Sequence, residues 1–186
     1  AGFCGECENL VFEAPFPGYF SKTYPLGWAV VSPEPVTGLT VDFRSGVAGA
    51  GHTVAATGIR FTAPPGQRHA GGSATMNIFT DVGVGGLGVA HGWSDVQFVI
   101  RDVATGAEQC RARLETSNLA AGAWYARDVR DHGERTLGCR FERDPSSETT
   151  FDATIELRAY GTYAGLVGGH SVLRAEFKRI DVELCP

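Results

Sequence analysis

The sequence predicts an all-β fold: a two-sheet antiparallel β-sandwich or jelly roll with long glycine-rich loops and at most one short helix. Apolar and polar residues alternate with a period of two in several segments, which is typical of half-buried strands. Turn-forming residues are frequent, with 25 glycines and 9 prolines among 186 residues. Few segments show the period of an amphipathic helix. Many short strands separated by such turns indicate two packed antiparallel sheets.

The clearest alternation lies in residues 151–160 (FDATIELRAY), where odd positions are apolar and even positions are polar or Tyr. Residues 39–44 and 96–101 alternate in the same way. A turn after residues 96–101 leads to residues 110–114, where apolar and charged side chains alternate again. These two segments therefore predict a hairpin that places Cys110 on the core face.

The last predicted strand changes its apolar parity partway along. Apolar residues fall on odd positions in residues 173–177 and on even positions in residues 180–184. Because a change of parity would turn one set toward solvent, we expect a β-bulge at Lys178–Arg179 that keeps both sets facing the core.

Residues 119–132 fit two structures. A helix would be capped by Asn118 and Gly133. Alternatively, residues 119–122 form a tight turn, and a strand runs from Ala123 to Arg130. We favour the strand.

Long glycine-rich loops are expected in four places, and binding residues would lie on them. The third contains GVGGLG at residues 83–88, which matches the GxGxxG pattern. The residues that follow lead into a strand and not into a phosphate-binding helix, so we expect no nucleotide site. The four expected loops are Gly46–Gly51, Pro64–Gly72, Gly83–Gly92 and Gly161–Gly169.

Length and composition predict one domain over residues 1–186. A chain of this length, with 43% hydrophobic and 20% charged residues, can bury a sizeable core. Its formal net charge is −5 and it has no basic cluster, which argues against nucleic-acid binding because phosphates require clustered Lys and Arg. No stretch of 18 apolar residues occurs, so we expect no membrane insertion.

Five cysteines fit a secreted, extracellular protein stabilised by disulfides. The opening Ala-Gly-Phe-Cys, without an initiator Met, fits a mature product after signal removal. The sequence leaves the pairing open. If the first and last strands are neighbours, Cys185 lies near Cys4 or Cys7, and Cys110 with Cys139 is then the natural second pair. One thiol would remain over.

Local motifs for catalysis or metal binding are weak. The segment Cys4–Cys7 has CxxC spacing, but nearby acidic residues oppose a reactive thiolate and no second ligand pair accompanies it. Residues 91–95 (HGWSD) bring His, Ser and Asp together, but catalytic triads are assembled from distant segments. We expect no cofactor, although Asp128 with Asp131, or Asp144 with Glu148, could contribute oxygens to a calcium site.

Five aromatic residues fall within residues 15–28 (PFPGYFSKTYPLGW), a segment of loop character. Exposed aromatic rings stack on sugars or grip a partner, whereas the alternative is an arm that packs its rings over the end of the sandwich. The expected ligand-binding residues are Phe16, Tyr19, Phe20, Tyr24, His91, Trp93, Asp95 and Tyr163.

Three functions are therefore considered. The first is a secreted, non-catalytic module that binds a glycan or another cell-surface ligand. The second is a structural protein of a surface, appendage or virion that forms homo-oligomers. The third is a β-sandwich hydrolase or lyase, which the sequence favours least.

Overall fold

The computed structural model describes residues 6–16, 20–24, 28–34, 38–45, 48–165 and 168–186. These residues form eleven strands joined by turns and bends and contain no helix, so none of them could span a membrane as a helix. The strands are β1 (Glu8–Glu13), β2 (Phe20–Tyr24), β3 (Trp28–Glu34), β4 (Gly38–Ser45), β5 (Ala48–Ala63), β6 (His69–Gly85), β7 (Gly88–Asp102), β8 (Glu108–Gly122), β9 (Tyr125–Glu142), β10 (Thr149–Gly165) and β11 (Gly168–Cys185).

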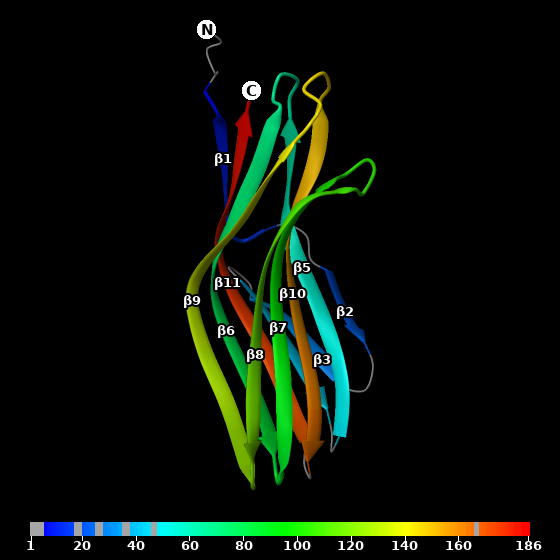
Figure 1. Ribbon diagram of the computed structural model, residues 1–186, viewed down its shortest axis with the longest axis vertical. Helices are drawn as coiled ribbons and strands as arrows, with labels where there is room; N and C mark the ends of the chain where they lie inside the picture. Colours follow the sequence, from blue (N-terminus) through cyan, green and yellow to red (C-terminus); the bar gives the residue numbers. More distant parts are fainter. Residues whose placement is uncertain (1–5, 17–19, 25–27, 35–37, 46–47, 166–167) are drawn as a thin grey trace.

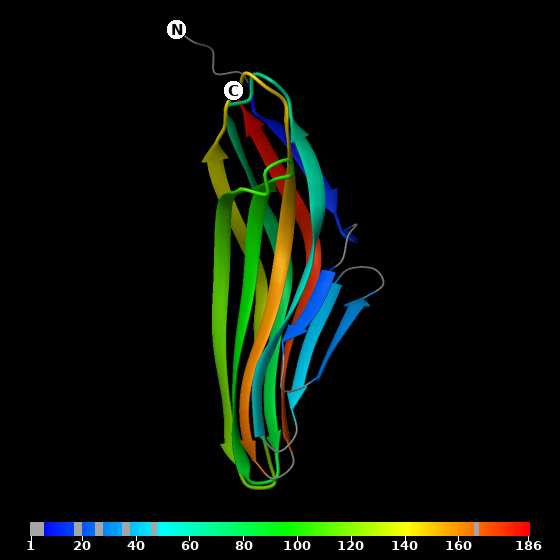
Figure 2. The same ribbon diagram turned by 90° about the vertical axis from the view of Figure 1, so that its right-hand side faces the viewer.

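Two antiparallel sheets pack face to face in a long, narrow molecule (Figures 1 and 2). Sheet A has the order β3-β4-β11-β6-β9, with β1 also paired to β11, and sheet B has the order β2-β5-β10-β7-β8. The predicted two-sheet antiparallel β-sandwich is therefore confirmed. Strand β11 ends at one end of the molecule (Figure 1). The turns at residues 86–87 and 123–124 lie at the opposite end, which we call the far end.

Strand β11 organises sheet A. One of its edges pairs with β6 along the whole strand, whereas the other pairs first with β4 and then with β1. Its register with β6 shifts between Phe177 and Arg179, which confirms the bulge predicted at Lys178–Arg179. Phe177 and Ile180 are both buried on either side of the shift, so both apolar sets reach the core.

The main core lies between the sheets and is formed by alternate residues of the long strands. Phe98, Phe151 and Met76 are among its largest fully buried side chains. The ring of Phe151 packs 5.5 Å from that of Phe61 and 5.1 Å from that of Phe141. Burying a side chain of this size stabilises a fold by about 1.5–3 kcal/mol relative to leaving it exposed.

The expectation of long glycine-rich loops is wrong. Most of the residues expected in them lie within β5, β6, β7, β10 and β11, which extend to the far end. A Cβ atom on Gly92 would lie 2.3 Å from the side chain of Val82, and one on Gly169 would lie 2.4 Å from the ring of Tyr163. These glycines therefore allow the two sheets to approach closely, which a sequence cannot distinguish from a flexible loop.

Residues 119–132 are extended, as favoured, but the turn lies elsewhere. Strand β8 continues to Gly122, because it pairs with β7 as far as Gly88. The chain then reverses at Ala123–Trp124 and not at residues 119–122. Tyr125 N–H donates to the Ala123 carbonyl at 3.0 Å, and Trp124 between them has a φ of 74°.

Two disulfides fix strands that are distant in sequence. Cys7 is bonded to Cys185, which joins the start of β1 to the end of β11. Cys110 is bonded to Cys139, which joins β8 to β9, the edge strands of opposite sheets. The second pair is the one the sequence favoured. For the first, the structure selects Cys7; Cys4 lies outside the described residues.

Candidate functional site

Three of the expected binding residues, His91, Trp93 and Asp95, lie on β7 within sheet B. They occupy alternate positions, so their side chains share one face of the sheet. The intervening residues Gly92 and Ser94 are buried between the sheets. We call this outer surface of β7, with its neighbours on β8 and β10, the β7 face. A strand, and not a loop, therefore carries these residues.

An aromatic group occupies the β7 face. The ring centroids of His91 and Trp93 are 4.2 Å apart, with their planes tilted by 48°. The Nε2 atom of His91 lies 2.7 Å from the Ser117 hydroxyl on β8, which restrains the imidazole. Tyr160 on β10 is the cross-strand partner of Trp93, and such partners have Cβ atoms about 4.5–5.5 Å apart. Trp93 is partly exposed, so a flat apolar surface is accessible here.

Asp95 is the centre of a group of hydrogen-bonded polar side chains next to Trp93. Its side chain is 1% exposed although it lies on the outer face, because long neighbouring side chains cover it. Its Oδ2 atom accepts hydrogen bonds from Arg113 Nε at 2.7 Å and from Gln97 Nε2 at 3.1 Å. The hydrogen bond to Asp95 also raises the pKa of Arg113. The carboxylate is therefore fixed in place by both partners.

Two atoms of this group lack a hydrogen-bond partner within the part of the chain that is described. They are Oδ1 of Asp95 and Nε of Arg158, both shielded from solvent. Arg158 on β10 is the cross-strand partner of Asp95. Leaving a buried polar atom unbonded costs about 1–3 kcal/mol. Both atoms are covered, so a ligand can reach only the outer guanidinium nitrogens here: the side chains of Arg113 and Arg158 are 51% and 32% exposed.

The rest of the β7 face and the adjoining surface of sheet B carry paired charges. Arg60 bonds Asp152 at 2.9 Å, and Arg101 bonds Glu156 at 3.0 Å. Exposed ion pairs of this kind contribute only about 0–1 kcal/mol to stability. Their larger effect is on surface chemistry, because they offer many donors and acceptors with little net charge.

The sequence analysis missed the contribution of β10. Alternation in residues 151–160 already placed Glu156, Arg158 and Tyr160 on the outward side of a strand. Nothing in the sequence showed that this strand pairs with β7 in a register that puts Arg158 opposite Asp95. The pairing of β10 with β7, two strands that are distant in sequence, therefore decides which residues lie in the site.

Two other expected residues face the core. Tyr163 is 3% exposed and lies between the sheets, where burial raises the pKa of its phenol. The ring of Phe16 lies 5.7 Å from that of Phe177, which fits the alternative of an arm packed on the sandwich. Neither residue joins the β7 face.

The remaining aromatic candidates lie in or near β2. Phe20 and Tyr24 are the first and last residues of β2, which pairs with β5. Tyr24 lies opposite His52, and His52 lies opposite Tyr160, so the backbone at Tyr24 continues the row that contains Trp93. Tyr19 lies outside the described residues.

A second charged cluster lies on the outer face of sheet A. Asp81 on β6 accepts hydrogen bonds from Arg127 Nε at 2.9 and 3.0 Å and from His170 Nε2 at 3.3 Å. Burial would raise the pKa of Asp81, but the hydrogen bonds from Arg127 and His170 together lower it below its usual value. A Cβ atom on Gly83 would lie 2.4 Å from the His170 ring, so glycine makes room for this ring. Both carboxylate oxygens are occupied, so the cluster is a structural ion pair.

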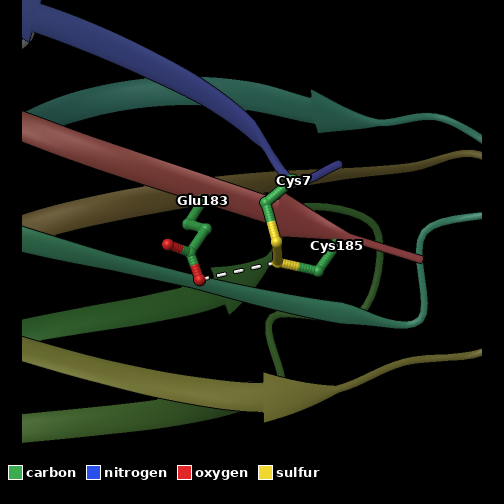
Figure 3. A group of neighbouring side chains, drawn as sticks. All are labelled: Cys7, Glu183 and Cys185. Carbon is green, nitrogen blue, oxygen red and sulfur yellow. Dashed lines mark hydrogen bonds between the residues drawn. A yellow bond between two sulfur atoms is a disulfide. The ribbon is translucent and has the colours of Figure 1, made fainter. Parts of the chain in front are cut away.

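Among the described residues, a group with the composition of a metal site consists of Cys7, Glu183 and Cys185 (Figure 3). Oε1 of Glu183 lies 3.5 Å from the sulfur of Cys185, which is bonded to the sulfur of Cys7. Metals bind thiolates, and a disulfide offers none, so this group does not fit a metal ion.

The acidic residues considered for calcium are engaged in local contacts. Oδ2 of Asp128 accepts from Leu119 N–H at 3.2 Å, and Oδ1 of Asp131 accepts from Gly133 N–H at 2.9 Å. Asp144 accepts from Ser146, and this contact lowers the pKa of Asp144. Calcium binding stays a prediction.

No protein-family model matches the chain, and no curated protein matches it. Its structural neighbours include β-sandwich carbohydrate-binding modules. TmCBM61 in complex with β-1,4-galactotriose is 8% identical with a TM-score of 0.29, covering 84% of this chain and 88% of that one. A family 11 carbohydrate-binding module from Clostridium thermocellum is 11% identical with a TM-score of 0.27, covering 89% and 95%. The CBM22-1 xylan-binding domain from Paenibacillus barcinonensis is 14% identical with a TM-score of 0.26, covering 99% and 97%. At these values the likenesses carry no argument about a ligand.

Proposed function

We propose that this chain is a secreted, non-catalytic module that binds a glycan on the β7 face. The observation that carries the proposal is the position of Trp93, a partly exposed ring beside the accessible guanidinium groups of Arg113 and Arg158, which the buried Asp95 and the partly buried Glu156 hold in place. Aromatic surface and fixed polar atoms together match a sugar ring, which presents an apolar face and a rim of hydroxyl groups.

The charge pattern favours a neutral glycan. Arg113 is held by Asp95, and Arg101 by Glu156, so these cations are already neutralised. An anionic sugar would have to compete with these carboxylates. A neutral hydroxyl group can accept a hydrogen bond from the exposed guanidinium of Arg113 or Arg158 without separating an ion pair, which supports an uncharged ligand.

Secretion is supported by the two disulfides, because such bonds persist mainly in oxidising compartments.

We also propose that the sandwich is a jelly roll. From β4 to β11, every connection passes from one sheet to the other except β7 to β8. Eight strands wound in this way over two sheets support that architecture.

The test is isothermal titration calorimetry against a panel of neutral oligosaccharides, with anionic oligosaccharides for comparison. We expect a neutral ligand whose affinity falls at least tenfold in Trp93→Ala, since truncating an aromatic contact residue commonly costs more than about 1.4 kcal/mol. Arg158→Lys keeps the charge but replaces the planar guanidinium and its several N–H donors by an ammonium group, so it should also weaken binding.

The matched control is Trp124→Ala, which removes an aromatic side chain that is 87% exposed and lies at the far end. This variant should bind the same ligand with unchanged affinity. A panel without a neutral ligand, or a ligand whose affinity is the same for Trp93→Ala and the unmodified protein, would overturn the proposal.

A further inference from the structure

Charged residues are absent from four long segments of the sequence. Residues 45–59, 82–94, 116–126 and 159–173 contain no Lys, Arg, Asp or Glu. With 20% charged residues in the chain as a whole, about two or three would be expected in each. These segments are far apart in sequence, so their common property has meaning only if the fold brings them together.

The strand pairing brings the described parts of the four segments together at the far end. Gly88 pairs with Gly122 on one side and with Gly165 on the other. In sheet A, Gly85 pairs with Tyr125 and with Gly168. The start of β5 pairs with the end of β10 at the same end. Among the described residues, the turns at 86–87 and 123–124 and the strand ends that flank them therefore carry no formal charge, and they lie opposite the end where β11 finishes (Figures 1 and 2).

Large apolar side chains are exposed on this uncharged end. Four of the eight exposed large hydrophobic residues in the described part of the chain lie in or beside the turns of the far end. Their exposed fractions are Leu87 62%, Val89 48%, Trp124 87% and Tyr125 61%. Several large apolar side chains exposed at one end of a molecule indicate an interaction site.

Trp124 has the most unusual backbone of this group. It is the central residue of a γ-turn closed by Tyr125 N–H and the Ala123 carbonyl, with a φ of 74°. A bulky residue rarely adopts positive φ, and the conformation costs of the order of 1 kcal/mol or more. Gly86 N–H donates to the Trp124 carbonyl at 2.5 Å, which ties the two turns together. The fold thus holds the indole of Trp124 out in solvent on a strained backbone.

We propose that the far end binds the far end of a second copy of this chain, giving an end-to-end dimer with two-fold symmetry. Each copy has a formal charge of −5, and every Lys, Arg, Asp and Glu lies outside the four uncharged segments. The turns of the far end are therefore where two copies can meet without desolvating an unpaired charge, since Arg127, which lies beside Tyr125, is already bonded to Asp81. The centres of protein interfaces are likewise depleted of charged residues and rich in Trp and Tyr.

The same surface fits a lipid bilayer less well. Peripheral membrane binding is strengthened by Lys and Arg near the inserted side chains. None occurs in the four segments, and the whole chain is acidic. This surface adjoins the β7 face, because Val89 and His91 lie two positions apart on the same side of β7. Trp93 itself lies five residues along β7 from Gly88, a distance of about 17 Å, so a Trp93 variant tests glycan binding separately.

Sedimentation velocity from about 1 μM to about 500 μM protein tests the proposal. We expect a concentration-dependent dimer whose affinity is unchanged or stronger in high salt, because salt screens the repulsion between acidic chains. Trp124→Gly and Leu87→Glu should each weaken the dimer at least tenfold. Glycine accepts positive φ, so Trp124→Gly should not lower the melting temperature, which separates lost dimerisation from misfolding.

Val103→Glu is the matched control, since Val103 is 38% exposed in the turn between β7 and β8, away from the far end. It should dimerise normally, as should Trp93→Ala. A monomer at every concentration, or a dimer that Trp124→Gly leaves unchanged, would overturn the proposal. So would monomeric protein that co-sediments with phosphatidylcholine vesicles through Trp124, because a bilayer would then be the partner.

Discussion

The disulfide between Cys110 and Cys139 joins β8 to β9 and should contribute a large part of the stability of the fold. We expect the double variant Cys110→Ala/Cys139→Ala to unfold more easily because its unfolded chain regains conformational entropy. The two cysteines are separated by 29 positions. Loop-closure entropy for a loop of this length corresponds to about 3.6 kcal/mol at 25 °C. For 186 residues this would lower the melting temperature by about 9 °C.

Urea titrations followed by circular dichroism, with calorimetry under non-reducing conditions, measure this loss. The comparison is Cys7→Ala/Cys185→Ala, which opens a loop with a separation of 178 and should cost about 5 kcal/mol. A loss below about 1 kcal/mol for the shorter loop would refute the reasoning. So would a smaller loss for the longer loop than for the shorter one.

Two further predictions concern the Asp81 cluster. Gly83→Ala would place a Cβ atom 2.4 Å from the ring of His170 and displace it from Asp81, and we expect a loss of about 1 kcal/mol in urea unfolding; unchanged stability would show that the ring adapts freely. Asp81→Asn should destabilise the protein by about 1–3 kcal/mol at pH 7. The pKa of Asp81 is lowered on folding from about 3.8, so its stabilisation is complete above that pH and is lost as the pH falls through the folded value. The difference between Asp81→Asn and the unmodified protein should therefore shrink in acid, and a difference that stays constant down to pH 2 would contradict this.

The local alternation of apolar and polar residues was sufficient to predict much of the fold. Alternation in residues 151–160 identified β10, and the change of parity in the last strand located the bulge near Lys178, because side-chain period and burial are local properties. Glycine misled the sequence analysis. A glycine in a flexible loop and a glycine such as Gly92, where a neighbouring sheet leaves no room for a Cβ atom, look the same in a sequence.

The candidate site was only partly predictable. His91, Trp93 and Asp95 stood out as a local cluster of chemically useful residues, although a loop was expected around them. Arg158 and Tyr160 come from a strand about 65 positions later along the chain, and only the pairing of β10 with β7 brings them to Trp93.

The sequence by itself therefore determined the all-β class and the uncharged character of four segments, because both follow from composition or short-range pattern. It favoured the cysteine pair Cys110–Cys139, which the structure then decided. Tertiary structure alone decided which side chains share the β7 face and that the four uncharged segments meet at one end. Both depend on the register of strands far apart in the chain. That register is fixed by how the two sheets pack together, which no local pattern contains.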